Sequence, residues 1–307
     1  PQQRPRSIHR TTTTMAQLLL RGEPLGTVGG QPIAVKAVLF DKDGTLSYSE
    51  PMLLRLARAR IDQCLARLDA RSTGLPVPGQ APAPGGGVCG PGEPRSEHVA
   101  ALLGGSGRAA LIDLLRRAYG IEGQGLHPGG ITAVAARDHN LIATATALSQ
   151  AGLIWPDALA VAEAAFEATD ALVGDESLPE PTAGLVSLLE RFDRAGLVCA
   201  VISNDHRQGI HSFLERHALA HRFAATWSAE DHPRKPSAGA VQGLCGLLGI
   251  PPGHCALIGD AASDLRMAAA AGVPLALGYR SGWQRPPGLD PGSLSLEHWD
   301  ELEAVAP

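Results

Sequence analysis

The 307-residue sequence lacks three features that would point to particular classes of protein. It lacks paired cysteines: the five present are odd in number and form no C-x-x-C motif, which favours a reduced, cytoplasmic setting over a disulfide framework. It lacks a basic excess, with 26 Lys and Arg against 31 Asp and Glu, so we expect no nucleic-acid partner. It also lacks any apolar run near the ~20 residues of a membrane span, so we expect no membrane partner.

Composition and periodicity divide the chain into three parts. Residues 1–30 are predicted to be an N-terminal extension, whose first 14 residues contain three arginines, four consecutive threonines and no acid. That composition fits a transit peptide or, as we favour, a leader before Met15. Residues 31–50 and 181–307 are predicted to form the core, and residues 51–180 an inserted helical part.

Strand–helix alternation after residue 181 predicts the fold of the core. Such alternation is typical of βαβ units and therefore of a parallel sheet. The predicted strands, after a first one at 37–40, lie at 197–202, 225–227, 256–258 and 274–277. We therefore expect an α/β fold with a doubly wound, Rossmann-like parallel sheet. A small strand pair, 18–20 with 25–28, is expected before it.

The inserted part shows helical periodicity without strands. Helices are predicted over 52–71, 99–119, 132–150 and 156–172. The first has an apolar face and an opposite face with several arginines, namely Arg55, Arg58, Arg60 and Arg67. Between the first two, residues 72–96 hold six Pro and seven Gly, so we expect a loop there.

The chain is organised around the apolar segment that ends at Phe40 and is followed by Asp41 and Asp43. Four consecutive apolar residues suit a strand buried on both faces of a parallel sheet. Carboxylates at the carboxyl end of such a strand lie where open α/β sheets bind ligands. Gly44 is expected to bend the backbone so that both carboxylates reach the same mouth. Alone, the segment could equally be a solvated Asp-Gly turn.

Four short motifs, in order along the chain, favour a ligand site over a solvated turn. They are Asp41-Lys42-Asp43-Gly44-Thr45, Val201-Ile202-Ser203-Asn204, Lys235-Pro236, and Ile258-Gly259-Asp260 with Asp264 four residues on. In this order they resemble the motifs of the haloacid dehalogenase superfamily, in particular its phosphoglycolate-phosphatase-like members. The resemblance spans about residues 34–277. It implies that the insertion is a helical cap that covers the catalytic mouth and selects the substrate.

The chemistry of a phosphatase would suit these residues. A carboxylate such as Asp41 can attack phosphorus and form an aspartyl-phosphate. Asp43 can protonate the leaving oxygen and then activate water, and two carboxylates this close should not both ionise freely. The family assigns the same two roles to the two aspartates of its first motif.

Other motif residues could bind the phosphate and compensate the negative charge of the site. Ser203 and the amide of Asn204 could donate to phosphate oxygens, and Lys235 could offset the carboxylates. By resemblance, Thr45 would bond within the turn that holds Asp43. Lys42 departs from the apolar residue of many family members, and we expect it near the cap.

Several acids beside a phosphate require a cation, and oxygen ligands favour Mg²⁺. By resemblance its ligands would be Asp41, the backbone carbonyl of Asp43, and Asp260. Asp264 is expected to lie behind these ligands and orient them, although it could also be an ordinary acid in the first turn of a helix.

The sequence thus predicts a Mg²⁺-dependent hydrolase of a small phosphorylated metabolite, acting through an aspartyl-phosphate. A sugar-phosphate mutase or phosphotransferase of the same family would show identical core motifs. A non-catalytic binding module that kept the fold is a further alternative, against which the complete acid set argues. A dehalogenase is disfavoured because Asp43 has no evident use in that chemistry.

Overall fold

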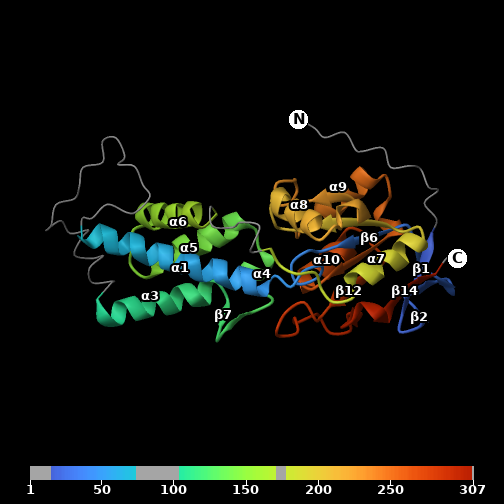
Figure 1. Cartoon of the computed structure of the whole chain (residues 1–307), viewed down its shortest axis with the longest axis horizontal. Coiled ribbons are helices and arrows are strands. Elements are labelled where there is room, and N and C mark those ends of the chain that lie inside the picture. The colour runs from blue at the N-terminus through green and yellow to red at the C-terminus, as the bar shows by residue number, and fades with distance from the viewer. Residues whose placement is uncertain (1–14, 74–103, 171–177, 306–307) are drawn as a thin grey trace. The chain divides into compact units, whose positions relative to one another are not determined.

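The structure, a computed structural model, describes residues 15–73, 104–170 and 178–305. The chain divides into two compact units, Pro1–Glu50 with Leu178–Pro307, and Pro51–Ser177 (Figure 1). Most of the predicted Pro/Gly-rich loop, and residues 1–14, lie outside the described residues. Within the described ranges, no helix combines the length and the apolar character needed to cross a membrane.

A six-stranded sheet forms the centre of the first unit, and every pair of neighbouring strands is parallel. Its order is β10-β9-β6-β11-β12-β13. The strands are β6 (Ala37–Phe40), β9 (Val198–Ile202), β10 (Phe223–Trp227), β11 (Cys255–Gly259), β12 (Leu275–Tyr279) and β13 (Ser295–Leu296). From β6 the chain builds outward on one side and then returns to build on the other, so β6 lies at the switch point of a doubly wound fold. This confirms the predicted α/β class.

Strand β6 is buried because helices cover both faces of the sheet. Its alternate residues belong to two hydrophobic clusters, Val38 and Phe40 to one and Ala37 and Leu39 to the other. Helices α7 (Leu185–Arg194) and α8 (Arg207–Arg216) contribute to the first cluster, and α9 (Ala238–Leu248) and α10 (Ala262–Ala270) to the second. The strand that precedes Asp41 is therefore anchored from both sides.

The start and the end of the described chain pair with each other. β1 (Ala16–Leu20) runs antiparallel to β14 (Leu302–Val305), which follows the short 3₁₀ helix η4 (Trp299–Glu301), and β1 also pairs with β5 (Ala34–Val35). The sequence predicted that residues 18–20 pair with residues 25–28, and this pairing is wrong in detail. β1 pairs with β2 (Glu23–Pro24), whereas β3 (Thr27–Val28) pairs with β4 (Gln31–Pro32). Gly26, at a φ of +68°, interrupts the extended run between β2 and β3.

The second unit is helical. Among its described residues, the helices are α1 (Glu50–Thr73), whose first residue lies in the other unit, α3 (Gly105–Ala118), α4 (Ile131–Val134), α5 (Arg137–Gln150) and α6 (Trp155–Asp170). A hairpin that the sequence did not predict, β7 (Ile121–Glu122) with β8 (Gly125–Leu126), follows α3. Helix α1 continues through Ser72 and Thr73, two residues into the predicted loop.

Two of the arginines predicted on the face of α1 opposite its apolar face are buried. Arg60 and Arg67 are 5% and 7% exposed. The Arg60 guanidinium lies 3.8 Å from the centre of the Phe166 ring on α6, and Arg67 bonds to Gln63 one turn earlier. A flat guanidinium can stack on an aromatic ring, so an arginine can occupy an interior helix face.

The junction of β1 with η4 gives a testable stability prediction. Glu301 accepts the backbone N–H groups of Glu297 and His298 and pairs with Arg21. Burial acts to raise the pKa of Glu301, but these bonds outweigh it and hold the pKa below the ordinary 4.5. The stabilisation is therefore present above pH 4.5 and is lost as the pH falls through the lowered pKa. We expect Glu301→Gln to cost about 1 kcal/mol at neutral pH and almost nothing in acid, by thermal melts against pH.

Glu303→Gln is the matched control, because Glu303 lies two residues further on, in β14, with an exposed side chain. Equal losses for the two variants at neutral pH would contradict the prediction.

Candidate active site

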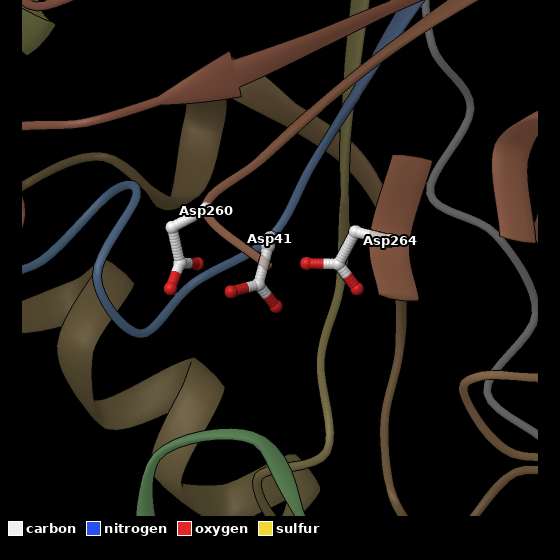
Figure 2. Close-up of side chains that lie close together, drawn as sticks. All are labelled: Asp41, Asp260 and Asp264. Atoms are coloured by element: carbon white, nitrogen blue, oxygen red, sulfur yellow. The ribbon is translucent and has the colours of Figure 1, made fainter. Parts of the chain in front are cut away.

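Three buried carboxylates meet at the carboxyl edge of the parallel sheet. Asp41 follows β6, Asp260 follows β11, and Asp264 lies in the first turn of α10. They come together because β6 and β11 are paired neighbours, with Phe40 opposite Ile258, and the Asp41 amide donates to the Ile258 carbonyl at 2.9 Å. Carboxylate oxygens of the three residues lie within 4.8 Å of one another and point toward one another (Figure 2).

Lys235 neutralises part of this cluster. Its Nζ donates to Asp41 Oδ1 at 2.6 Å and pairs with Asp264 Oδ1 at 2.9 Å. The side chain is 8% exposed. Burial works against a charged ammonium, but Asp264 and Asp41 outweigh it and raise the pKa of Lys235. Lys235 therefore stays protonated and holds two of the three acids in fixed positions.

The carboxyl groups are difficult to ionise together. Burial raises the pKa of Asp41 to about 6 in spite of Lys235, and the charges of Asp264 and Asp43 act in the same direction. Burial also raises the pKa of Asp260 well above its ordinary value, reinforced by Asp41 and Asp264. Fully ionised, three carboxylates against one ammonium leave two uncompensated negative charges. A buried set of oxygen donors with this excess fits a divalent cation that prefers oxygen ligands.

Asp43 lies in a separate network with Lys42. Its Oδ1 accepts from Lys42 Nζ at 2.8 Å and from Ser49 Oγ at 2.5 Å, and Lys42 also pairs with Asp205 at 2.9 Å. Burial opposes the charge on Lys42, but Asp205 and Asp43 outweigh it and raise the pKa of Lys42. Lys42, which departs from the apolar residue of many family members, is 2% exposed and lies between two carboxylates of the first unit.

The remaining motif residues lie at the same edge. Ser203, which follows β9, accepts the Asp205 N–H on its Oγ at 3.1 Å, and Asn204 comes next, half-buried. Thr45 bonds within the turn through its backbone N–H, which donates to the Lys42 carbonyl at 3.3 Å. Its hydroxyl donates to Asp260 Oδ1 at 3.1 Å, because the chain turns at Gly44 and carries the buried Thr45 toward the end of β11.

Some residues of the site were not identified from the sequence. The Trp283 indole N–H donates to Asp260 Oδ2 at 2.7 Å. Ser49 and Asp205 hold the ends of the Asp43–Lys42 network. Ser49 and Asp205 follow motifs closely enough to be candidates, whereas Trp283 lies in a segment without any motif.

Comparisons with known proteins place these residues in context. A family model of haloacid dehalogenase-like hydrolases matches residues 35–272. A phosphoglycolate phosphatase of Mesorhizobium japonicum is 28% identical over 138 residues, which cover 44% of this chain and 58% of that protein. A phosphoglycolate phosphatase of Thiobacillus denitrificans is 33% identical over 106 residues, covering 33% and 47%. The chain thus spans about half the length of the curated relatives it matches.

A solved structure has a similar fold. The crystal structure of a protein from Haemophilus somnus, described as a predicted phosphoglycolate phosphatase, superimposes with a TM-score of 0.55 at 18% identity. The match covers 86% of this chain and 95% of the other. At this identity the likeness concerns the fold.

The buried position of Lys42 leads to a prediction. Lys42→Met would leave Asp43 and Asp205 without their shared cation. Breaking a fully buried pair costs ~3–5 kcal/mol, and because both acids reach water here we expect about 2 kcal/mol. Denaturant unfolding measures the loss. Lys36→Met removes a half-buried lysine from the same unit and should change stability little; an equal loss in both variants would show that lysine charge in general, and not this pairing, matters.

Proposed function

The chain belongs to the haloacid dehalogenase-like hydrolases, and from this premise we propose that it hydrolyses small phosphomonoesters with the help of Mg²⁺, through an aspartyl-phosphate on Asp41. One observation carries the proposal. Asp41 lies buried at the carboxyl end of the central strand, is held by Lys235, and has two further carboxylates beside it. A carboxylate held in this way at a switch point can act as a nucleophile toward a ligand bound at the sheet edge.

In the first step an Asp41 carboxylate oxygen bonds to phosphorus while the bond from phosphorus to the leaving oxygen breaks. Lys235 orients Asp41 through Oδ1 and provides positive charge for the phosphoryl oxygens. Ser203 accepts an N–H bond on its oxygen and still has a hydroxyl proton to donate to phosphate. The amide of Asn204 is the second proposed donor.

Asp43 is proposed to move the protons. It would protonate the leaving oxygen in the first step and take a proton from water in the second, when water attacks phosphorus and releases Asp41. Ser49 and Lys42 hold its carboxyl group away from the three-carboxylate cluster, so it can act on the leaving group while Asp41 acts on phosphorus.

The proposed cation is Mg²⁺, held by Asp41, Asp260 and the backbone carbonyl of Asp43. When bound, it would supply positive charge to the phosphoryl oxygens. Asp264 would orient the site through its bond with Lys235.

The proposed substrate is a small phosphorylated metabolite. The relatives named phosphoglycolate phosphatases make 2-phosphoglycolate the first compound to assay. We assign the choice of substrate to the helical insertion, residues 51–180. We place the reaction in the cytoplasm, because the four cysteines that the structure describes are buried free thiols.

Replacement of the two motif aspartates tests the mechanism. We expect Asp41→Asn to lower turnover about 1000-fold or more with an intact fold, because the nucleophile is lost while the volume is kept. Asp43→Asn should keep part of the activity on p-nitrophenyl phosphate, whose leaving group needs little protonation, and lose more on alkyl phosphates. Phosphate release measures both, with Asp300→Asn, at an exposed side chain, as the control. More than a few per cent of activity left in Asp41→Asn would rule out the covalent route.

Metal removal tests the cation. A chelator should abolish phosphate release, and added Mg²⁺ should restore it. Ca²⁺ should restore it poorly, because it takes more ligands in a looser geometry. Full turnover in chelator would overturn the cation assignment. In the same assay, sugar-phosphate interconversion faster than phosphate release would identify a mutase instead of a phosphatase.

A further inference from the structure

Trp283 lies outside every motif and yet contacts the centre of the site. It follows β12 in the sequence and its side chain is 6% exposed. Its indole N–H donates to Asp260 Oδ2 at 2.7 Å, in a fully buried hydrogen bond. A buried N–H that short to a carboxylate strongly restricts where the carboxylate can point.

With the bond from Trp283, both carboxylate oxygens of Asp260 accept a hydrogen bond. Thr45 Oγ1 donates to Oδ1 at 3.1 Å, from the opposite end of the same carboxylate. The χ2 torsion of an aspartate, which sets the plane of its carboxylate, takes a broad range of values when the group is unrestrained. With one donor on each oxygen, the plane of the Asp260 carboxylate is set.

The indole itself is fixed against the catalytic turn. A Cβ at Gly44 would lie 2.0 Å from the indole nitrogen, and Gly44 has a φ of +77°. Position 44 therefore requires glycine for its backbone conformation and for the space that Trp283 fills. The next residue, Gln284, donates its backbone N–H to Glu50 Oε2 at 2.7 Å, and this bond fixes the position of the loop that carries Trp283.

The chemical type of the donor matters. Lys235 already holds Asp41 and Asp264 with a full positive charge. A second ammonium on Asp260 would reduce the excess from two negative charges to one and so weaken the attraction for a divalent cation. An indole N–H is neutral and only donates, so it can orient Asp260 and leave its negative charge for the metal.

We propose that Trp283 is a positioning residue for the cation site, which presents Asp260 to a divalent metal in a fixed orientation. The inference deepens the proposed function, on which it rests for the identity of the metal. Groups that orient a metal ligand typically contribute about 10–100-fold to metal affinity.

The test is Mg²⁺ binding to the full chain without substrate, by isothermal titration calorimetry. We expect Trp283→Phe to raise the Mg²⁺ Kd about 10-fold. Trp227→Phe is the matched control, because Trp227 is also buried but donates its N–H to the Pro233 carbonyl. Its Kd should match that of the unmodified chain. An unchanged Kd in Trp283→Phe would overturn the proposal.

A second replacement separates the N–H from the ring and covers the case that Trp283→Phe folds poorly. At position 283, β-(3-benzothienyl)alanine keeps the bicyclic shape and has sulfur in place of the N–H. We expect the same rise in Kd from this analogue. A Kd equal to that of the unmodified chain would mean that ring volume alone matters, and the proposal would be wrong.

Intrinsic fluorescence gives a readout that does not depend on turnover. Mg²⁺ should change the emission of the unmodified chain and of Trp155→Phe, which removes an exposed tryptophan, but not that of Trp283→Phe. A full change retained in Trp283→Phe would count against the proposal.

The two proposals can fail separately. Phosphomonoester hydrolysis by the unmodified chain, together with an unchanged Kd in Trp283→Phe, would overturn the role of Trp283 alone. A raised Kd in a chain that hydrolyses no phosphomonoester would overturn the proposed function and keep the role of Trp283.

Discussion

The excess of buried negative charge at the end of β6 is the constraint on which the rest of the site depends. Parallel pairing of β6 with β11 brings Asp41 and Asp260 side by side, and α10 adds Asp264. Such a cluster is stable only when its charges are compensated and its oxygens bonded. Lys235 compensates two of the acids, and the third is held by neutral donors alone among the bonds described for its oxygens. This uneven compensation gives the cluster its capacity for a cation.

The second aspartate of the turn has a different environment, which separates its role from that of the first. Asp43 accepts bonds from Lys42 in the turn and from Ser49 just after it, and the segment after β9 reaches this network through Asp205, which pairs with Lys42. Two lysines thus each bridge two carboxylates within one unit. The two networks use different cations for their ion pairs, yet the charge of Asp43 still helps to raise the pKa of Asp41. Each of the two aspartates is therefore held by its own set of bonds.

Local features of the site could be predicted from the sequence, and long-range ones could not. The apolar run before Asp41 identified β6, and strand ends placed Ser203 and Asp260 at one edge, because parallel strands end together. The Thr45–Asp260 bond joins residues 215 positions apart, and no local sequence pattern predicts it. The burial of Arg60 depends on Phe166 from another helix, so helical periodicity alone does not predict it. The role of Trp283 depends on the course of a loop, which periodicity does not describe.

Support for the turn that carries Asp41 and Asp43 extends beyond the part of the chain that has motifs. Trp299 donates its indole N–H to the Thr182 hydroxyl at 2.8 Å, and that hydroxyl donates to the Thr45 carbonyl at 2.8 Å. The Trp299 ring stacks on Tyr279, with centres 4.1 Å apart, and meets Phe40 edge-on. The last described strand, β14, begins three residues later and pairs with β1. The segments that carry β1 and β14 therefore brace the turn that holds both aspartates, through Trp299 and Thr182.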